Sequence, residues 1–242
     1  MKILVTGHEG FIGSHVYSHL KELGFDVTGI DFPVDIGNFS EYCDLYNPKF
    51  DVVIHLAAFA ALRDSIQNPD KFWENNVVKS QPVFDYCKEN NVRLLYASSA
   101  GVYGWWMNPY AITKKVNEIQ APPDSVGMRF FNVWAENDSR SDMLYRMLQE
   151  NTATYLTRHL RDWIHVNDVV SAICCLIPST HTGPIDIGTG QTTSVLELAE
   201  KMGRGDLPVK NDTPGEPDSL CADTRDLYSL GWCPTINILD AI

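Results

Sequence analysis

Apolar and polar positions follow two different rhythms along the first 133 residues. Short, largely apolar runs rich in β-branched residues have the character of strands. Between them, apolar residues recur three or four positions apart, as on one face of a helix. The predicted strands lie at 2–6, 26–31, 50–58, 92–99 and 127–133, and the predicted helices at 12–23, 79–89 and 109–120. This alternation predicts an α/β fold with a Rossmann-type, doubly wound parallel sheet.

The alternation of strand-like and helix-like patterns becomes less regular after Val133. A helix at 168–177, a strand at 183–188 and a helix at 194–202 can still be recognised, followed by a tail rich in Pro, Gly and Asp. We therefore expect a sheet domain and a small, shortened C-terminal lobe. The sheet domain is predicted to comprise residues 1–133 and about 163–190, and the lobe residues 134–162 and 191–242.

The amino-acid composition of the chain limits which partners and which cellular compartment are expected. The chain has 242 residues and a formal net charge of −12, which disfavours nucleic acid and anionic membrane surfaces as partners. Its six cysteines show no C-x-x-C spacing and are interpreted as small core residues in a reducing compartment. The N-terminal run resembles a strand rather than a signal peptide, and no apolar run has membrane-spanning length. We expect a cytoplasmic protein.

Glycines at Gly7, Gly10 and Gly13 directly follow the first strand and open the first helix. A dinucleotide site needs this arrangement, because the backbone must turn tightly, approach a pyrophosphate and place a helix N-terminus behind it. The alternative is a glycine-rich turn without a ligand. Asp31 ends the second strand, where a carboxylate can accept hydrogen bonds from ribose hydroxyls and would repel a 2′-phosphate. NAD is therefore favoured over NADP, unless Asp31 only caps a turn.

Ser99, Tyr110 and Lys114 form the candidate catalytic group. Tyr110 and Lys114 are four residues apart on a predicted helix and share one face. A lysine ammonium near a phenol stabilises the phenolate and lowers the tyrosine pKa, so that tyrosine becomes a usable base. Ser99 ends a predicted strand, at the sheet edge where open α/β sheets bind ligands. A Tyr-x-x-x-Lys step alone is weak, and its specificity comes from the accompanying glycine loop.

With these features together, the chain resembles an extended short-chain dehydrogenase/reductase of the nucleotide-sugar epimerase/dehydratase family. The resemblance runs nearly end to end and depends on the order and spacing of its motifs. The motifs are TGHEGFIGSH, DVVIHLAA, NNV, YASSAGVYG, NPYAITKK, RFFNVW, RDWIHVNDVV, DIGTGQTTSVLELA and PGEPDSLCADTRDLYSLGWCP.

The resemblance implies roles for individual residues. The sheet domain would bind NAD, Ser99, Tyr110 and Lys114 would be catalytic, and Asn132 and Arg161 would contact the diphosphate of a nucleotide-sugar substrate. Tyr110 and Lys114 would also touch the cofactor. The other implied cofactor residues are Gly7, Gly10, Phe11, Ile12, Gly13, Asp31, Asp35, Ile36, Leu56, Ala57, Ala58 and Asn76. Family members commonly form homodimers through the helices found here at 79–89 and 109–120.

Two departures from the family pattern bear on function. Dehydratases of this family carry acidic residues after the serine, but Ala100 and Gly101 stand here and cannot serve as acid or base. Relatives also place a diphosphate-binding arginine just before PGE, where this chain has Thr213. Either diphosphate affinity is weaker, or another arginine such as Arg158 or Arg204 replaces it.

Several suggestive residues receive structural interpretations. His165 is predicted to be a hydrogen-bonded structural residue, and Asp168 an N-cap or first-turn charge of a helix. Trp105 and Trp106 could stack on a base or sugar, or pack against the lobe. The mixed charges of RDSIQNPDKFWENN, at 63–76, are interpreted as a solvated helix face.

The leading hypothesis is an NAD-dependent nucleotide-sugar epimerase acting at C4, through transient oxidation to a 4-keto sugar. Within the enzymes, the alternatives are a nucleotide-linked keto-sugar reductase and a 4,6-dehydratase. The alternative from another class is a non-catalytic NAD(P)-binding sensor or scaffold, for which the shortened lobe and Thr213 argue.

Overall fold

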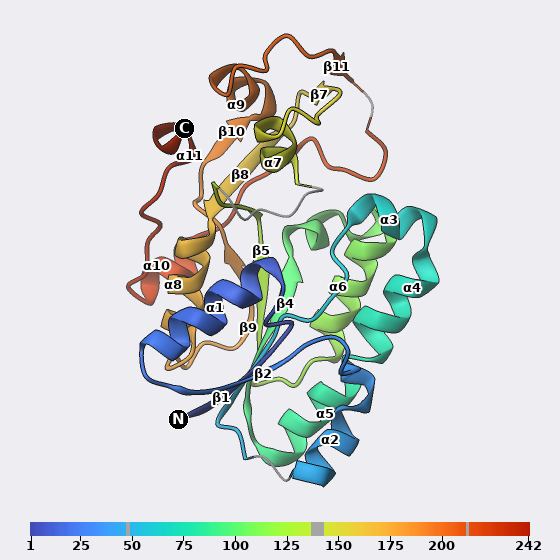
Figure 1. The fold of residues 1–242 in the computed structure, drawn as a ribbon, viewed down its shortest axis with the longest axis vertical. Coiled ribbons are helices and arrows are strands. Elements are labelled where there is room, and N and C mark those ends of the chain that lie inside the picture. The colour runs from blue at the N-terminus through green and yellow to red at the C-terminus, as the bar shows by residue number, and fades with distance from the viewer. Residues whose placement is uncertain (47–48, 137–142, 212) are drawn as a thin grey trace.

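A six-stranded parallel sheet forms the centre of the molecule (Figure 1). The computed structural model describes residues 1–46, 49–136, 143–211 and 213–242. The strand order is β2-β1-β3-β4-β5-β9. The strands are β1 (Lys2–Thr6), β2 (Asp26–Ile30), β3 (Val52–His55), β4 (Arg93–Ser99), β5 (Val126–Phe130) and β9 (Gly183–Ile187). The predicted doubly wound α/β sheet is thus confirmed.

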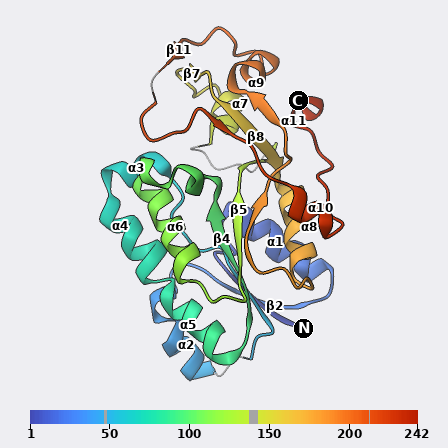
Figure 2. The same cartoon turned by 180° about the vertical axis from the view of Figure 1, so that it is seen from behind.

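Helices cover both faces of this sheet (Figures 1 and 2). One face carries α1 (Phe11–Glu22) and α8 (Val166–Leu176), and the other carries α2 (Phe39–Tyr46), α5 (Gln81–Asn90) and α6 (Pro109–Gln120). On β1, Ile3 and Val5 belong to one hydrophobic cluster and Leu4 to the other. Burial on both faces explains why the strand sequences are almost continuously apolar.

The sheet changes winding direction between β1 and β3. β2 lies on one side of β1 and β3 on the other, so the loops after β1 and β3 diverge and leave a crevice at the carboxyl edge. β2 is an edge strand, and the chain leaves it through the short turn η1 (Ile36–Asn38) before α2. The glycine loop and the ends of β3 and β4 therefore meet at one edge.

A smaller lobe stands above that edge (Figure 1). Its sheet contains β6 (Asn132–Trp134), β8 (Leu160–His165), β10 (Thr192–Ser194) and β12 (Ser219–Leu220), and β7 (Leu156–Thr157) pairs with β11 (Val209–Lys210). Its helices are α7 (Leu144–Gln149), α9 (Val195–Lys201) and α11 (Ile238–Ala241), whereas α10 (Arg225–Ser229) packs against β9 of the large sheet. Trp134, Tyr145 and Trp163 are buried in its own hydrophobic cluster.

Short elements between β3 and β5 bring further side chains to the same edge. They are α3 (Leu62–Gln67), α4 (Pro69–Trp73), the π-helical turn η2 (Glu74–Val78) and the 3-10 segment η3 (Ala100–Met107). In the part of the chain that the structure describes, no helix combines the length and apolar character needed to cross a membrane.

His165 and Asp168 have the structural roles predicted for them. His165 is the N-cap of α8, where its Nδ1 accepts from Asn167 N at 3.2 Å. Asp168 is buried in the first turn, and its carboxylate accepts from the backbone N–H groups of Thr235 and Ile236. These bonds attach the C-terminal segment to the sheet domain.

Candidate active site

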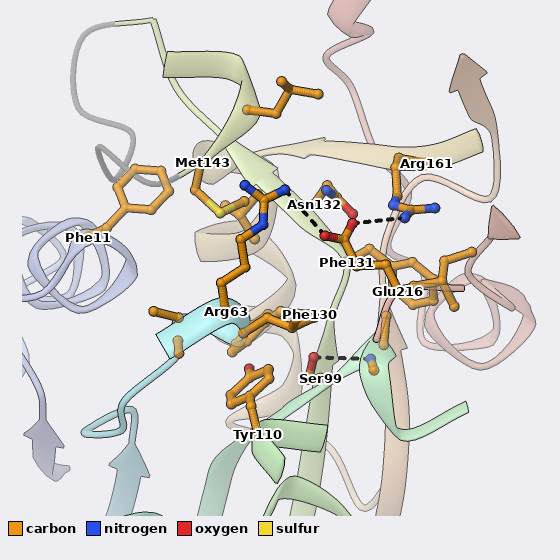
Figure 3. Close-up of a pocket in the computed structure, with 18 of the residues that line it drawn as sticks. Phe11, Arg63, Ser99, Tyr110, Phe130, Phe131, Asn132, Met143, Arg161 and Glu216 are labelled. Atoms are coloured by element: carbon orange, nitrogen blue, oxygen red, sulfur yellow. Dashed lines mark hydrogen bonds and ion pairs between the residues drawn. The ribbon is translucent and has the colours of Figure 1, made fainter. Parts of the chain in front are cut away.

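A cavity of about 760 Å³ lies between the carboxyl edge of the large sheet and the lobe. Its lining comes from the glycine loop, the ends of β3 and β4, α3, the start of α6 and the lobe segments around β7, β8 and Glu216. Figure 3 shows Ser99 and Tyr110 on one side of this cavity and Arg161 with Glu216 on another. Both parts of the molecule therefore contribute to one site.

The glycine loop has the conformation that its sequence predicts. Gly7 has a φ of +73°, and a Cβ there would lie 2.6 Å from Ala57 N. A Cβ on Gly13 would lie 1.9 Å from Gly7 O, so only glycine permits this approach of α1 to the loop. Gly10, the N-cap of α1, has no side chain to cap the first turn, and the residues that begin α1 line the cavity. The lining residues of this segment are Gly7, Gly10, Phe11, Ile12 and Gly13.

This geometry fits a dinucleotide pyrophosphate, because backbone N–H groups and the positive end of a twelve-residue helix face the cavity. Asp31 lies directly beside the loop: its Oδ2 accepts from Glu9 N at 2.8 Å. Asp31 is not among the residues that line the cavity, and neither are Asp35 and Ile36, which lie farther along the chain. Asp35 pairs with Lys79 at 2.5 Å, and that bond holds the pKa of its carboxyl below the usual value.

The loop after β3 lies opposite the glycine loop. Leu56 and Ala58 line the cavity, whereas Ala57 packs against Gly7 and its N–H donates to Thr6 Oγ1 at 3.3 Å. Asn76 is fully buried outside the lining. Its Oδ1 accepts from Phe59 N at 2.8 Å, and its Nδ2 donates to Thr113 Oγ1 at 3.2 Å. Asn76, one of the residues implied to serve the cofactor site, therefore ties this loop to α6.

The candidate catalytic residues converge on the cavity. Ser99 ends β4, and its Oγ accepts from Gly101 N at 3.1 Å. Asn108 caps α6 by accepting from Ala111 N, which places Tyr110 in the first turn and Lys114 one turn later. Lys114 Nζ lies 5.9 Å from the centroid of the Tyr110 ring, and all three residues line the cavity.

Burial decides the electrostatics of Lys114. The side chain is almost fully enclosed and donates to Ala97 O at 2.9 Å, and burial lowers its pKa to about 7. Nearby His55 is buried as well, and burial followed by the charge of Lys114 lowers its pKa to about 3. His55 is therefore neutral near pH 7, whereas Lys114, with a pKa of about 7, is divided between its charged and neutral forms and is the group that can place positive charge beside Tyr110.

Arg161 and Asn132 are the substrate residues expected on the lobe side, and both line the cavity. Arg161 comes from β8 and is buried, which lowers its pKa. Its Nη1 donates to Asp218 O at 3.3 Å, and its Nη2 donates to His159 Nδ1 at 2.7 Å and lies 3.5 Å from Glu216 Oε2.

Thr213 does not leave an open position where relatives have arginine. Its Oγ1 lies 2.9 Å from His159 Nε2. Since His159 Nδ1 accepts from Arg161, the imidazole proton is on Nε2 and donates to Thr213. Arg158 and Arg204 donate to asparagine side chains elsewhere, and neither is among the described residues that line the cavity.

The position of Arg63 shows that one prediction from the sequence is wrong. The segment 63–76 was expected to form a solvated, charged helix face, but Arg63 points from α3 into the cavity (Figure 3). Its Nη2 lies 3.4 Å from Glu216 Oε1. Spacing along the sequence gives no signal for this, because α3 has only six residues and its orientation depends on contacts with α6. Trp105 and Trp106 lie edge to face, with centroids 6.0 Å apart, outside the cavity lining.

Known proteins similar to this chain match it along nearly its whole length. The model of the NAD dependent epimerase/dehydratase family matches residues 3–188. Protein CapI of Staphylococcus aureus is 32% identical over 321 aligned positions that cover 100% of this chain and 96% of the relative. A UDP-glucose 4-epimerase of Pisum sativum is 29% identical, covering 96% of this chain and 90% of that protein. The aligned lengths exceed this chain's own, so the relatives carry residues that it lacks.

Solved structures also match nearly the whole chain. MoeE5 in complex with UDP-glucuronic acid and NAD superposes with a TM-score of 0.86 at 26% identity, covering 99% of this chain and 95% of that one. The UDP-glucose 4-epimerase of Thermotoga maritima, solved with UDP-glucose, has a TM-score of 0.86 at 22% identity, with 99% and 96% covered, and shows the shared fold.

Proposed function

The chain belongs to the NAD dependent epimerase/dehydratase family, and we propose that it is an NAD-dependent enzyme that inverts a nucleotide-diphosphate sugar at C4. The observation that carries the proposal is the cavity that joins the glycine loop, Ser99, Tyr110, Lys114 and Arg161. Relatives named as UDP-glucose 4-epimerases support the C4 position and UDP as the nucleotide.

NAD is the proposed cofactor, with Asp31 as the residue that selects it over NADP. The Asp31 carboxylate lies against the glycine loop, where an adenosine ribose would meet it. A 2′-phosphate at that point would face like charge. The similar structure of MoeE5, solved with NAD, supports NAD as the cofactor.

In the proposed mechanism, the Tyr110 phenolate removes the proton from the C4 hydroxyl of the sugar. The Lys114 ammonium stabilises the phenolate by charge, and Ser99 Oγ donates to the same sugar oxygen as the carbonyl forms. NAD, when bound, supplies the redox chemistry by accepting the hydride from C4 and returning it to the opposite face once the keto sugar has rotated in the cavity. Tyr110 then gives the proton back to the sugar oxygen.

Epimerisation is favoured over dehydration by the residues around Ser99. Ala100 and Gly101 offer no acid or base for the loss of water. Of the described residues that line the cavity, Asp64 and Glu216 are the carboxylates, and both are paired with cations.

We extend the proposal to the organisation of the protein. Residues 1–133 and about 163–190 would bind NAD, and residues 134–162 and 191–242 the nucleotide-sugar, with the boundary inside β8. A homodimer through α5 and α6 is proposed from the family resemblance, and Ile119 on α6, 73% exposed, suits such a contact. A cytoplasmic location remains a prediction.

The test begins with native mass spectrometry of the purified protein, which should detect bound NAD rather than NADP. A panel of UDP-, dTDP- and GDP-sugars is then assayed for C4 inversion by NMR. Replacing Tyr110 by Phe should lower the rate about 10³-fold while NAD remains bound, because the base is lost and the cavity is kept. Tyr103→Phe is the matched control, since the Tyr103 hydroxyl donates to Asp186 outside the cavity lining.

Three results would contradict the proposal. Full activity of Tyr110→Phe would remove the assigned base. A lasting change in absorbance at 340 nm on substrate addition would indicate a keto-sugar reductase. Binding of NAD without binding of any nucleotide-sugar would indicate the sensor or scaffold.

A further inference from the structure

The charge around Glu216 is unusual for a site that has to hold a diphosphate. The Glu216 carboxylate faces the cavity and lies 3.5 Å from Arg161 Nη2. It therefore offsets the one buried arginine of this region, in a protein that already carries a net charge of −12. Because Glu216 cancels the charge of Arg161, these two residues together offer no net positive charge to the negative oxygens of a diphosphate.

The residues next to Arg161 do not supply the missing charge. His159 accepts from Arg161 through Nδ1, and burial together with that arginine lowers its pKa, so it is neutral near pH 7. Thr213 stands where relatives carry arginine and has no charge to contribute. Lys114 is committed to Ala97 O on the catalytic side of the cavity.

Arg63 is the second cation at this point. Its guanidinium reaches Glu216 from the side opposite Arg161, so the carboxylate lies between the two arginines (Figure 3). The guanidinium carbon also lies 5.6 Å from the centroid of the Tyr155 ring, which lines the same cavity. With a side chain 61% exposed, Arg63 lies on the solvent side of the cavity, where an entering ligand can reach it.

The backbone of Arg63 is fixed relative to the catalytic residues. Two positions on, Ser65 is fully buried, and its Oγ accepts from Tyr110 N at 3.1 Å. α3 and α6 are therefore held together at the residue that carries the proposed base. A ligand group bound by Arg63 would be placed at a defined distance from Tyr110.

We propose that Arg63 binds the diphosphate of the substrate together with Arg161, and so takes over the work of the arginine that is missing at Thr213. This inference rests on the proposed function. In the absence of substrate, Glu216 occupies both guanidinium groups. When a nucleoside diphosphate enters, its oxygens replace the carboxylate on Arg63, since the planar guanidinium fork pairs with phosphate as well as with carboxylate.

The test is calorimetric titration of the NAD-loaded protein with UDP, which has the diphosphate but no sugar. Arg63→Gln should weaken UDP binding about tenfold and weaken UDP-glucose binding by the same factor. Arg63→Lys should show an intermediate loss, because it keeps the charge and loses the fork. Arg158→Gln, an arginine of the lobe outside the cavity lining, should bind UDP within about twofold of the native protein. Melting temperatures and NAD retention check that each variant is folded.

Each contrary result has a separate meaning. If Arg63→Gln binds UDP as Arg158→Gln does, Arg63 is a solvated arginine and the inference is wrong. If, in a parallel titration with UDP-glucuronate, the loss is confined to that sugar and spares UDP, Arg63 recognises a sugar carboxylate and its assignment to the diphosphate is wrong. If the native protein binds NAD but neither UDP nor any nucleotide-sugar, the proposed function itself fails, whatever the variants do.

Discussion

The two sides of the cavity present their functional groups by different means. On the sheet side, Gly7 and Ser99 lie where parallel strands end and Gly13 lies in the first turn of α1, so backbone geometry sets their positions. On the lobe side, Arg161 and Glu216 are positioned by side-chain pairs between short strands and loops. A backbone cradle tolerates little change in sequence. A charge pair can be rebuilt from another element, as the reach of Arg63 from α3 suggests.

The largest effect that we predict for this comparison concerns Lys114. Lys114→Met should lower epimerisation about 10³-fold, because the charge that stabilises the Tyr110 phenolate is lost. The matched control is Lys115→Met on the same helix: Lys115 pairs with Glu118 rather than facing the cavity, so this variant should stay within about threefold of the native rate. Equal losses in the two variants would show that α6 depends on lysine charge in general.

Lys114→Met should also be more stable than the native protein. The pKa of Lys114 falls from 10.5 in the unfolded chain to about 7 in the fold, so the unfolded chain binds more protons between those values. Native stability therefore rises with pH across that window, and the advantage of Lys114→Met shrinks from pH 7 to pH 10. Denaturant unfolding at pH 7 should show a gain on the order of 2 kcal/mol, which allows for the lost bond to Ala97 O. A gap independent of pH would contradict the assigned cause.

The sheet side could be predicted from sequence because its signals are local. Asn108 and Pro109 mark the start of α6, which extends to Gln120 as predicted. The glycine spacing likewise marks the loop without knowledge of the fold.

On the lobe side, the sequence predicts α9, and the family resemblance points to Arg161 and Asn132. The strand pairing could not be predicted, since some strands are two or three residues long and β7 pairs with β11 across more than 50 residues. Arg63 reaches Glu216 across 153 positions, and no periodicity encodes such a contact.

A smaller effect, on stability, should separate tight packing from backbone conformation in the glycine loop. Gly13→Ala places a methyl group against Gly7 O and should cost roughly 3 kcal/mol and most NAD affinity, because the loop must move. Gly24→Ala is the control at the other end of α1, where φ is +81° and nothing lies within 4 Å of the new Cβ. It should cost about 1 kcal/mol and leave NAD binding intact. Similar NAD losses in both variants would mean that the loop is not a specific cradle.

The smallest effect concerns Thr213, on the lobe side. Thr213→Val keeps the shape of the side chain but removes the oxygen that accepts from His159 Nε2, which should cost about 1 kcal/mol of stability in denaturant unfolding. UDP affinity should fall by less than about threefold, since Thr213 carries no charge and lies outside the cavity lining. That loss would be clearly below the one expected for Arg63→Gln. A tenfold loss in Thr213→Val would make its hydroxyl a substrate ligand, and the diphosphate site would then lie at the position that relatives use rather than being shared with α3.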